Sequence, residues 1–408
     1  MFYQIIKISA TSALITSFSL FAGGLDLSEY STSTSVGTAG NANQTNIRDA
    51  STVATNPAAM SFTKNDMLTI GISALDFHSD FEVDTSKSTH DGGGTDNAGG
   101  MNAVPGIYYV QKINDYVHWG AGLYSITGLG IKYDNDWAGR YHNQKVLLSS
   151  IRFGHSLSYR VSEEFSVGGS IYVDYATWET KVAFDTPGTS DGYLSVEDED
   201  PAVGAMASFM YTPGDTTRIG VTYRSKVVHN FKDKPDTRFS GVSDVIGDIE
   251  AEFELPQMVL VGVRQELTPK LAILMSGSWE EWSKFGELQV KTRAGEDDID
   301  RNYDDTYSVG IGLEYQLTDE WLLMCGYKYD SSVQTRSTRT ADLPLSSQRR
   351  YAVGAEYKYS KKMTIGVAYE YADLGTPKLD QTGNLSGTIS GEYDQYIQFF
   401  TLSCTYNF

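Results

Sequence analysis

Apolar and polar residues alternate one by one along the end of the chain, residues 398–408. One side of this segment carries Phe400, Leu402, Cys404, Tyr406 and Phe408, and the other carries Thr401, Ser403, Thr405 and Asn407. A period of two is that of a β-strand with one face in lipid and the other toward a polar interior. Because only a closed barrel satisfies every backbone group of such strands in hydrocarbon, the segment predicts the last strand of a bacterial outer-membrane β-barrel.

The same alternation recurs in earlier segments. Residues 307–317, 351–359 and 363–371 each place Tyr, Val, Ile, Leu or Met on one face, and Gly, Ser, Thr, Ala or charged residues on the other. A soluble two-sheet sandwich also alternates, but it rarely keeps aromatic residues at the strand ends on the apolar face. The pattern therefore favours a membrane barrel over a sandwich.

Short turn signals alternate with long polar segments, so the strands can be counted. The short turns are residues 114–115, 162–164, 213–215, 268–270, 318–320 and 360–362. The long polar segments are residues 85–102, 134–144, 185–201, 233–250, 292–304, 331–348 and 373–391. Short periplasmic turns and long extracellular loops are typical of outer-membrane barrels. Six turns and seven loops predict an all-β fold, a 14-stranded antiparallel transmembrane β-barrel within residues 62–408.

The start of the chain has the pattern of a secretory signal peptide. Lys7 precedes an apolar run, residues 8–22, which is followed by small residues. The run is shorter than the roughly 20 residues that a transmembrane helix needs. The prediction is a signal peptide over residues 1–23, with cleavage at position 22, 23 or 24.

Residues 24–61 are too polar for a membrane strand. They contain small residues at 37–42 and a short helical stretch at 49–60, where Asn56 is expected to cap a helix that begins at Pro57. Small residues pack closely, which suits a plug, or hatch, folded inside the lumen. The alternative is a disordered periplasmic tail.

Composition excludes some partners and adds no cofactor. The chain has 408 residues, 39 Gly, 27 Tyr, 17 Phe and a formal net charge of -20. Such an acidic chain repels nucleic acid and small anions, so neither is expected as a partner. Cys325 and Cys404 fall on lipid-facing positions of strands that are not neighbours, so no disulfide is expected. We expect no metal and no cofactor.

The third predicted strand breaks the alternation. Its lipid-facing set, Val117, Trp119, Ala121 and Leu123, should continue through Ser125 and Thr127, which are polar, while Tyr124 and Ile126 point inward. Gly128 and Gly130 follow, and glycine within a strand often marks a bulge or bend. One interpretation is a kinked strand that opens a side window in the wall. The other is a pair of surface hydroxyls with two glycines needed for curvature.

Four motifs resemble those of the FadL/TodX transporters of long-chain fatty acids and other hydrophobic compounds. They are Asn-Pro-Ala at 56–58, YDNDWAGRY at 133–141, Leu-Pro at 255–256 and SWEEWS at 278–283. The resemblance implies a monomeric barrel with an N-terminal hatch, a hydrophobic binding site near the outer loops, a deeper pocket beside the hatch, and lateral exit through the wall. Passive uptake would then need no energy input at this membrane.

The resemblance also gives candidate site residues. Those for the hatch face of the pocket are Asn56, Pro57 and Ala58, without a direct hydrogen bond from Asn56 to ligand. Those for the lateral opening are Tyr124, Ser125, Ile126, Thr127, Gly128 and Gly130. Those for ligand capture in the outer loop are Trp137, Arg140 and Tyr141. Arg140 is more readily explained by a structural role, bonding loop carbonyls, Asp134 or Asp136, and Trp279 and Trp282 are expected to pack loops or the membrane interface.

Other functions stay open from sequence. An uptake channel for aromatic hydrocarbons fits the same greasy lumen, while a general porin needs an open constriction and an adhesin needs active loops. A lipid hydrolase is disfavoured because the chain has no Gly-x-Ser-x-Gly elbow. The expected partners are a hydrophobic ligand such as a fatty acid, outer-membrane lipid and lipopolysaccharide, and the barrel-assembly machinery, through the strand that ends at Phe408.

Overall fold

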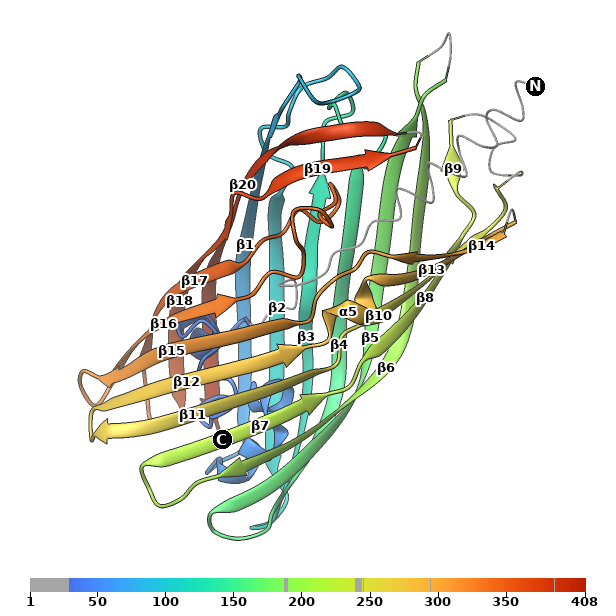
Figure 1. The fold of residues 1–408 in the computed structure, drawn as a ribbon. Helices are drawn as coiled ribbons and strands as arrows, with labels where there is room; N and C mark the ends of the chain where they lie inside the picture. The colour runs from blue at the N-terminus through green and yellow to red at the C-terminus, as the bar shows by residue number, and fades with distance from the viewer. Residues whose placement is uncertain (1–28, 187–189, 239–243, 245, 294, 385) are drawn as a thin grey trace.

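Fourteen antiparallel strands form a closed barrel in the computed structural model, which describes residues 29–408 apart from 187–189, 239–243, 245, 294 and 385 (Figure 1). The predicted signal peptide and residues 24–28 lie outside the described residues. The wall strands are β1 (Met67–Val83), β2 (Gly100–Lys112), β3 (Val117–Lys132), β4 (Lys145–Arg160), β5 (Phe165–Phe184), β6 (Gly192–Tyr211), β7 (Thr217–Arg224), β11 (Met258–Thr268), β12 (Leu271–Glu280), β15 (Thr306–Gln316), β16 (Trp321–Asp330), β17 (Gln348–Lys358), β18 (Met363–Gly375) and β20 (Gly387–Asn407). β1 pairs with β20 and closes the barrel, which confirms the predicted fold.

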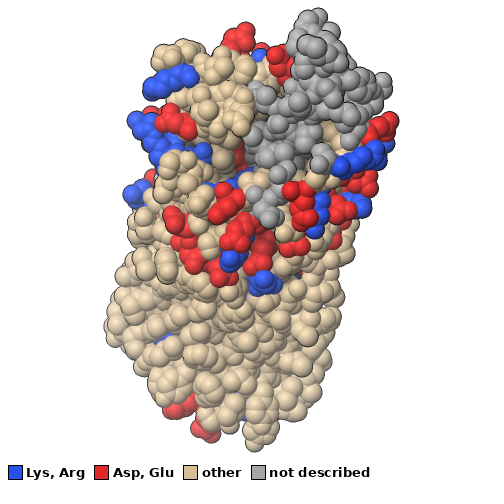
Figure 2. All heavy atoms as spheres, turned by 45° about the vertical axis from the view of Figure 1, so that its right-hand side comes forward, with Lys and Arg blue, Asp and Glu red and all other residues tan. Residues whose placement is uncertain are grey.

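The two faces of the wall follow the predicted alternation. In β20, Phe400, Leu402 and Phe408 are exposed, and the alternating Thr401, Ser403 and Thr405 are buried on the lumen side. The exposed apolar side chains form a broad uncharged band, and the charged residues gather mainly beyond it at the loop end (Figure 2). Cys325 and Cys404 are unpaired and lie on β16 and β20, which do not pair with each other. Within the described ranges, no helix is both long and apolar enough to span a membrane.

All six predicted short turns connect neighbouring wall strands, but four of the seven predicted loops contain strands. β6 already begins at Gly192, inside the predicted loop 185–201. A separate sheet contains β8 (Val227–Asp233), β10 (Ile249–Leu255), β13 (Glu287–Thr292) and β14 (Gly295–Asp300), and β9 (Asp236–Thr237), α5 (Trp282–Phe285) and β19 (Lys378–Gly383) complete the outer part. The strand count missed these strands because it was based on turn signals and treated polar segments as loops, although β10 alternates buried apolar residues with glutamates.

The N-terminal segment, residues 29–63, fills the half of the lumen nearest the short turns (Figure 1). It forms α2 (Ser33–Gly37), α3 (Thr52–Thr55) and the 3₁₀ helix η1 (Pro57–Phe62). Lumen-facing glycines of the wall let its backbone come close: a Cβ at Gly71 would overlap the carbonyl of Ser31, and one at Gly168 would overlap the backbone of Ala58. The segment is therefore packed directly on the wall.

Candidate functional site: an apolar chamber beside an unpaired seam

Strand β3 carries a one-residue bulge at Ile126. Ser125 pairs with Ile151 and Thr127 with Ser150, so Ile126 has no partner in β4. The Ser125 hydroxyl fills the bulge by donating to the Ser150 carbonyl at 2.6 Å. A bulge bends a strand and shifts its side chains by one position, so Thr127 is buried on the lumen side.

The bulge corrects one expectation about this strand. Thr127 was expected to face lipid, but the shifted register places it and Ile131 inside, and puts Gly128 and Gly130 on the outward side. A Cβ at Gly128 would meet only Ser125 Oγ, at 4.0 Å. The break of polarity in the sequence is thus the signature of the bulge.

The wall is unpaired between β2 and β3 beyond the bulge. Their register runs from Lys112 and His118 to Gly106 and Tyr124 and stops there. Residues 100–105 then pair with β1 alone, and residues 125 and 127–132 pair with β4 alone, until Lys132 N donates to the Ala98 carbonyl at 2.8 Å. Pro105 cannot donate to a ladder. We call this unpaired stretch the seam; Val104 and Ile126, which border it, are both buried.

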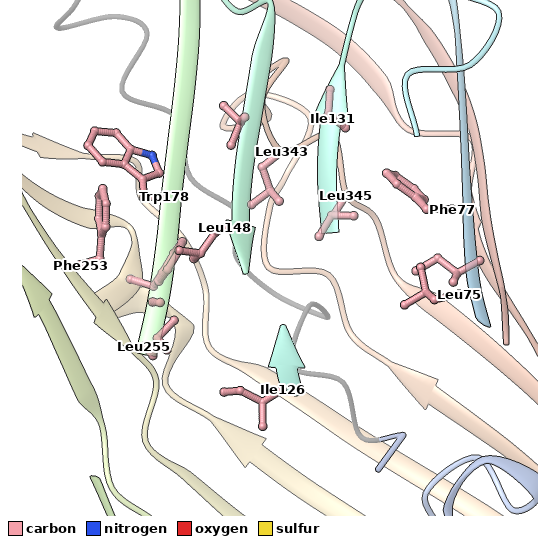
Figure 3. Packing of buried hydrophobic residues seen from close by; sticks show 14 of the residues in the cluster. Leu75, Phe77, Ile126, Ile131, Leu148, Trp178, Phe253, Leu255, Leu343 and Leu345 are labelled. Carbon is pink, nitrogen blue, oxygen red and sulfur yellow. The ribbon is translucent and has the colours of Figure 1, made fainter. Parts of the chain in front are cut away.

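Apolar side chains fill the lumen behind the seam and form what we call the chamber (Figure 3). They come from wall strands, from β10 and from the loop between β16 and β17: Leu75, Phe77, Ile126, Ile131, Leu148, Trp178, Phe253, Leu255, Leu343 and Leu345. All ten belong to one buried cluster. Polar lumens are usual in porins, so the apolar side chains in this half of the lumen distinguish it from a porin channel.

Buried polar groups lie next to the chamber, on β4 and β5. Arg152 pairs with Tyr124 across the strands, donates through Nε to Asp174 at 2.7 Å, and places its guanidinium over the ring of Tyr172 at 4.3 Å. Among the described residues, Arg152 Nη1, the Tyr172 hydroxyl and the Ser150 hydroxyl have no hydrogen-bond partner. Oδ1 of Asp174, the acidic partner of Arg152, is unpaired there as well. Buried polar groups are rarely left unpaired, so the cluster has both donors and an acceptor available to a polar group or to water.

Tyr30 and Ser31 of the N-terminal segment connect this region to the seam. Tyr30 packs its ring 5.7 Å from that of Tyr124 and accepts a hydrogen bond from Arg224 on its hydroxyl. Its carbonyl accepts from the Tyr108 hydroxyl at 2.8 Å. The next residue, Ser31, donates its hydroxyl to the Val104 carbonyl at the edge of the seam.

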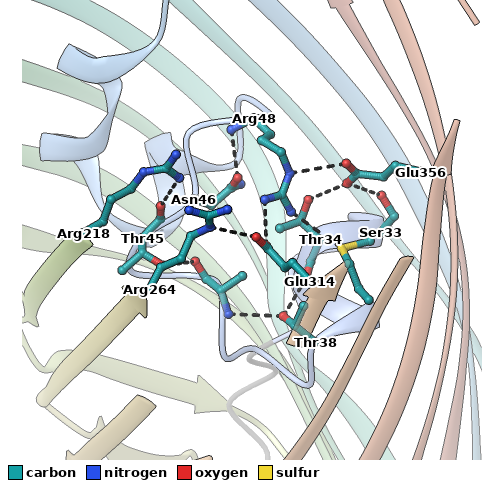
Figure 4. A network of polar contacts seen from close by, with 12 residues as sticks. Ser33, Thr34, Thr38, Thr45, Asn46, Arg48, Arg218, Arg264, Glu314 and Glu356 are labelled. Carbon is teal, nitrogen blue, oxygen red and sulfur yellow. Dashed lines mark hydrogen bonds and ion pairs between the residues drawn. The ribbon is translucent and has the colours of Figure 1, made fainter. Parts of the chain in front are cut away.

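The rest of the N-terminal segment is held by a buried charge network (Figure 4). Arg48 Nη1 lies 2.7 Å from Glu314 Oε1, and its Nε lies 3.4 Å from Glu356 Oε2. Arg264 binds the other oxygen of Glu314 at 2.8 Å. Arg48 thereby joins two wall strands, β15 and β17, that are not neighbours.

A family model described as "Outer membrane protein transport protein (OMPP1/FadL/TodX)" matches residues 12–408. The chain belongs to this family. The FadL/TodX family and the barrel place it in the outer membrane of a Gram-negative bacterium. Outer membrane protein P1 of Haemophilus influenzae is 27% identical over 413 residues, which cover 89% of this chain and 88% of that protein. The long-chain fatty acid transport protein of Salmonella typhi is 24% identical over 406 residues, which cover 91% and 92%.

Solved structures share the fold. A Pseudomonas aeruginosa FadL homologue superposes with a TM-score of 0.83 at 20% identity, over 96% of this chain and all of that chain. The toluene transporter TodX of Pseudomonas putida gives a TM-score of 0.69 at 16% identity, over 88% and 94%. At these identities the likeness concerns the barrel and leaves the ligand undecided.

The predicted hatch residues of this FadL/TodX chain anchor the segment to the wall. Asn56 caps η1 by accepting from Ala58 N at 3.1 Å, as the sequence predicts, and donates to the Gln44 carbonyl. Ser166 donates to the Ala58 carbonyl at 2.7 Å. Ala58 belongs to a small apolar cluster separate from the chamber. The role of Asn56, Pro57 and Ala58 in ligand binding stays a prediction.

The outer-loop candidates pack the loop. Trp137 is 0% exposed and stacks on Tyr133 with ring centroids 3.9 Å apart, so it presents no surface to solvent. Arg140 donates to the carbonyls of Asp91 and Trp137 and to the Asp191 carboxylate, which is also bonded by the Tyr141 hydroxyl. The carbonyl bonds match the structural interpretation, but the carboxylates beside Arg140 are those of Asp191 at 2.9 Å and Asp91 at 3.6 Å instead of Asp134 or Asp136.

The remaining sequence predictions concern the two tryptophans near α5. Trp282 is buried against Phe285, and Trp279 donates to Asp305 at 3.0 Å, so both pack the loop region as expected.

Sequence reasoning missed Arg152, although a single arginine at an inward position between Ile151 and Phe153 was a usable signal. It also missed Leu343 and Leu345, because a loop has no periodicity.

Proposed function

We propose that this chain carries long-chain fatty acids passively across the outer membrane, through the chamber and out of the wall at the seam. One observation supports this substrate class over plain hydrocarbons: Arg152 Nη1 and the hydroxyls of Tyr172 and Ser150 are buried beside the chamber and have no hydrogen-bond partner in the part of the chain that the structure describes. A carboxylate accepts from such donors, whereas a hydrocarbon leaves them unpaired. Relatives named long-chain fatty acid transport protein support the same class.

Transport then takes two steps. Burial of an acyl chain in the chamber supplies affinity, at about 25 cal/mol per Å² of apolar surface. Exit at the seam requires side chains such as Val104 and Ile126 to move, but no backbone ladder has to break. Movement of the hatch is proposed for the side chains of Tyr30 and Ser31 at its start, since the Ser31 backbone packs on Gly71 and Arg48 holds the segment further along.

Aromatic hydrocarbons are the second candidate. Trp178, Phe231 and Phe253 form a cluster with ring centroids 5.1 to 5.6 Å apart, and TodX, named as a toluene transporter, shares the fold. A general porin is disfavoured because residues 29–63 fill half of the lumen.

We propose no catalytic step. We also propose a monomer, surrounded by lipid and lipopolysaccharide and assembled through the strand that ends at Phe408.

A competition assay tests the substrate class. The assembled protein binds a fluorescent fatty acid, and oleate, oleyl alcohol and toluene are compared as competitors. Oleate and oleyl alcohol share the chain and differ in the head group, so the carboxylate alone is tested. We expect oleate to compete at least about tenfold better than the alcohol, because hydrogen bonds to a charged group contribute about 1.5–3 kcal/mol. Equal competition by the two would contradict the fatty-acid assignment, and preference for toluene would support the second candidate.

A further inference from the structure

We propose that residues 331–347, the loop between β16 and β17, form a lid that opens to admit ligand from outside the cell. This deepens the proposed function, on which it rests, by assigning the entrance of the chamber. We call these residues the lid loop. Its tip is exposed at Thr335, Arg336 and Ser337, whereas Leu343 and Leu345 are buried in the chamber (Figure 3).

The lid loop is attached to its surroundings by separate polar contacts. Asp342 pairs with Arg301 at 2.9 Å, and Ala341 accepts from the Tyr133 hydroxyl and donates its N–H to Gln381 at 2.8 Å. Arg339 donates to the Lys378 carbonyl at 2.7 Å. None of these partners belongs to β16 or β17. The lid loop is therefore attached to three other parts of the chain: the loop after β3, the loop before β15, and β19.

The lid loop is held in place differently from the N-terminal segment. The backbone of that segment packs against wall glycines such as Gly71 and Gly168, where a shift meets solid contacts. The lid loop forms only the isolated bridge between Thr340 and Leu343 and adds no strand to the wall. Water can replace its polar contacts when it opens.

Ligand can also replace its apolar contacts. Leu343 and Leu345 occupy the same buried cluster as Ile126 and Leu148. When the lid loop opens, the two leucines leave the chamber and expose apolar surface there. An acyl chain that enters buries that surface again, so ligand binding favours the open lid.

The pair Arg301–Asp342 is the more buried of the two described ion pairs of the lid loop. Its side chains are 8% and 0% exposed, and Oδ1 of Asp342 has no partner among the described residues. Removing one member of a buried ion pair leaves the other uncompensated and is strongly destabilising. The same loop carries a matched exposed pair, Arg336–Asp380 at 2.5 Å with Arg336 59% exposed, which is expected to contribute little.

Thiol labelling tests the lid without any fatty acid. Leu343→Cys is introduced after Cys325→Ser and Cys404→Ser, and intact cells are treated with a membrane-impermeant maleimide. Asp342→Asn is expected to speed labelling at position 343 at least about tenfold, and Arg336→Gln to leave it within about twofold. Tyr133→Phe removes the hydroxyl contact to Ala341 while keeping the ring, and is expected to speed labelling as well.

Retention of the folded, heat-modifiable band shows that each variant assembles. Labelling that stays unchanged in both Asp342→Asn and Tyr133→Phe would overturn the lid, and so would an equal acceleration by Arg336→Gln. Because labelling involves no ligand, it is independent of substrate: absence of oleate uptake in every variant, wild type included, would contradict the proposed function instead.

Discussion

Ser31 donates its hydroxyl to the carbonyl of Val104 at 2.7 Å, at the edge of the seam where β2 has lost its pairing with β3. Ser31 has φ 53°, a left-handed conformation that a non-glycine residue adopts at a cost. Its neighbour Tyr30 packs on Tyr124 beside the chamber. One dipeptide of the N-terminal segment thus contacts both the proposed ligand site and the proposed exit.

The first prediction concerns that contact. Ser31→Ala leaves the Val104 carbonyl unpaired, so we expect the seam to open more often and oleate release to become severalfold faster, at a stability cost of about 1 kcal/mol. Ser31→Gly removes the same bond but relaxes the left-handed φ, so it should be more stable than Ser31→Ala by up to about 1 kcal/mol. Release rates from preloaded protein and the melting of the folded band are the measurements. Slower release by Ser31→Ala would contradict the contact's role at the seam.

Arg152 gives the second prediction. Arg152→Gln removes the charged donor beside the chamber. Because a hydrogen bond to a charged group contributes about 1.5–3 kcal/mol, oleate affinity should fall roughly 10- to 100-fold, while oleyl alcohol affinity should change little. Pairing it with Asp174→Asn avoids leaving that buried carboxylate alone. Direct binding titrations measure both ligands. An equal loss for acid and alcohol would indicate a packing role for Arg152.

The third prediction concerns the network that holds the N-terminal segment. Glu314→Gln leaves Arg48 and Arg264 without their shared carboxylate, so we expect a loss of about 3–5 kcal/mol and a lower temperature for loss of the folded band. Ion conductance in a planar bilayer should rise. Glu266→Gln is the matched control, because Glu266 pairs with the same Arg264 but is partly exposed. If the control changed conductance as much as Glu314→Gln, the network would not be what holds the segment.

The outer loop supplies a pH dependence. Burial lowers the pKa of His142 to about 4, although a hydrogen bond with the Gly387 backbone raises it, and the ring lies 3.3 Å from the Ser386 hydroxyl. An unfolded histidine titrates near pH 6.5, so between pH 6.5 and 4 the unfolded loop binds a proton that the folded loop does not. Stability is therefore full above pH 6.5 and falls as pH drops toward 4, by about 3 kcal/mol in total.

Hydrogen exchange of residues 133–144 as a function of pH measures this effect. Protection should decrease as the pH falls below about 6.5 in the wild type, and the decrease should be much smaller in His142→Gln. Identical pH profiles for the two proteins would show that another group controls the loop.

Sequence predicted the barrel because every wall strand faces two different solvents, and alternation such as that of Tyr307 to Leu317 records this directly. The sequence could not decide whether β3 has a bulge. A one-residue shift at Ile126 and an unshifted strand with polar outward residues at Ser125 and Thr127 are both compatible with the same sequence. The lid loop has no periodicity, and the separate sheet was missed although β8 and β10 alternate between buried and more exposed residues, because the strand count was based on turn signals. The alternation of β4 indicates that Arg152 points inward, but its ion pair with Asp174 depends on the register between β4 and β5, which the sequence does not give.

The most direct test of the account is uptake of labelled oleate by a Gram-negative host that lacks its own fatty-acid transporter. Deleting Ile126 removes the bulge and restores a continuous register between β3 and β4, so we expect β2 and β3 to pair further and the seam to close. Gly128→Ala is the matched control, because space is open there. Wild type and Gly128→Ala should restore uptake, while the deletion should assemble and still bind oleate through the other chamber residues, but reduce uptake at least about tenfold. Normal uptake by the assembled deletion variant would contradict lateral exit at the seam.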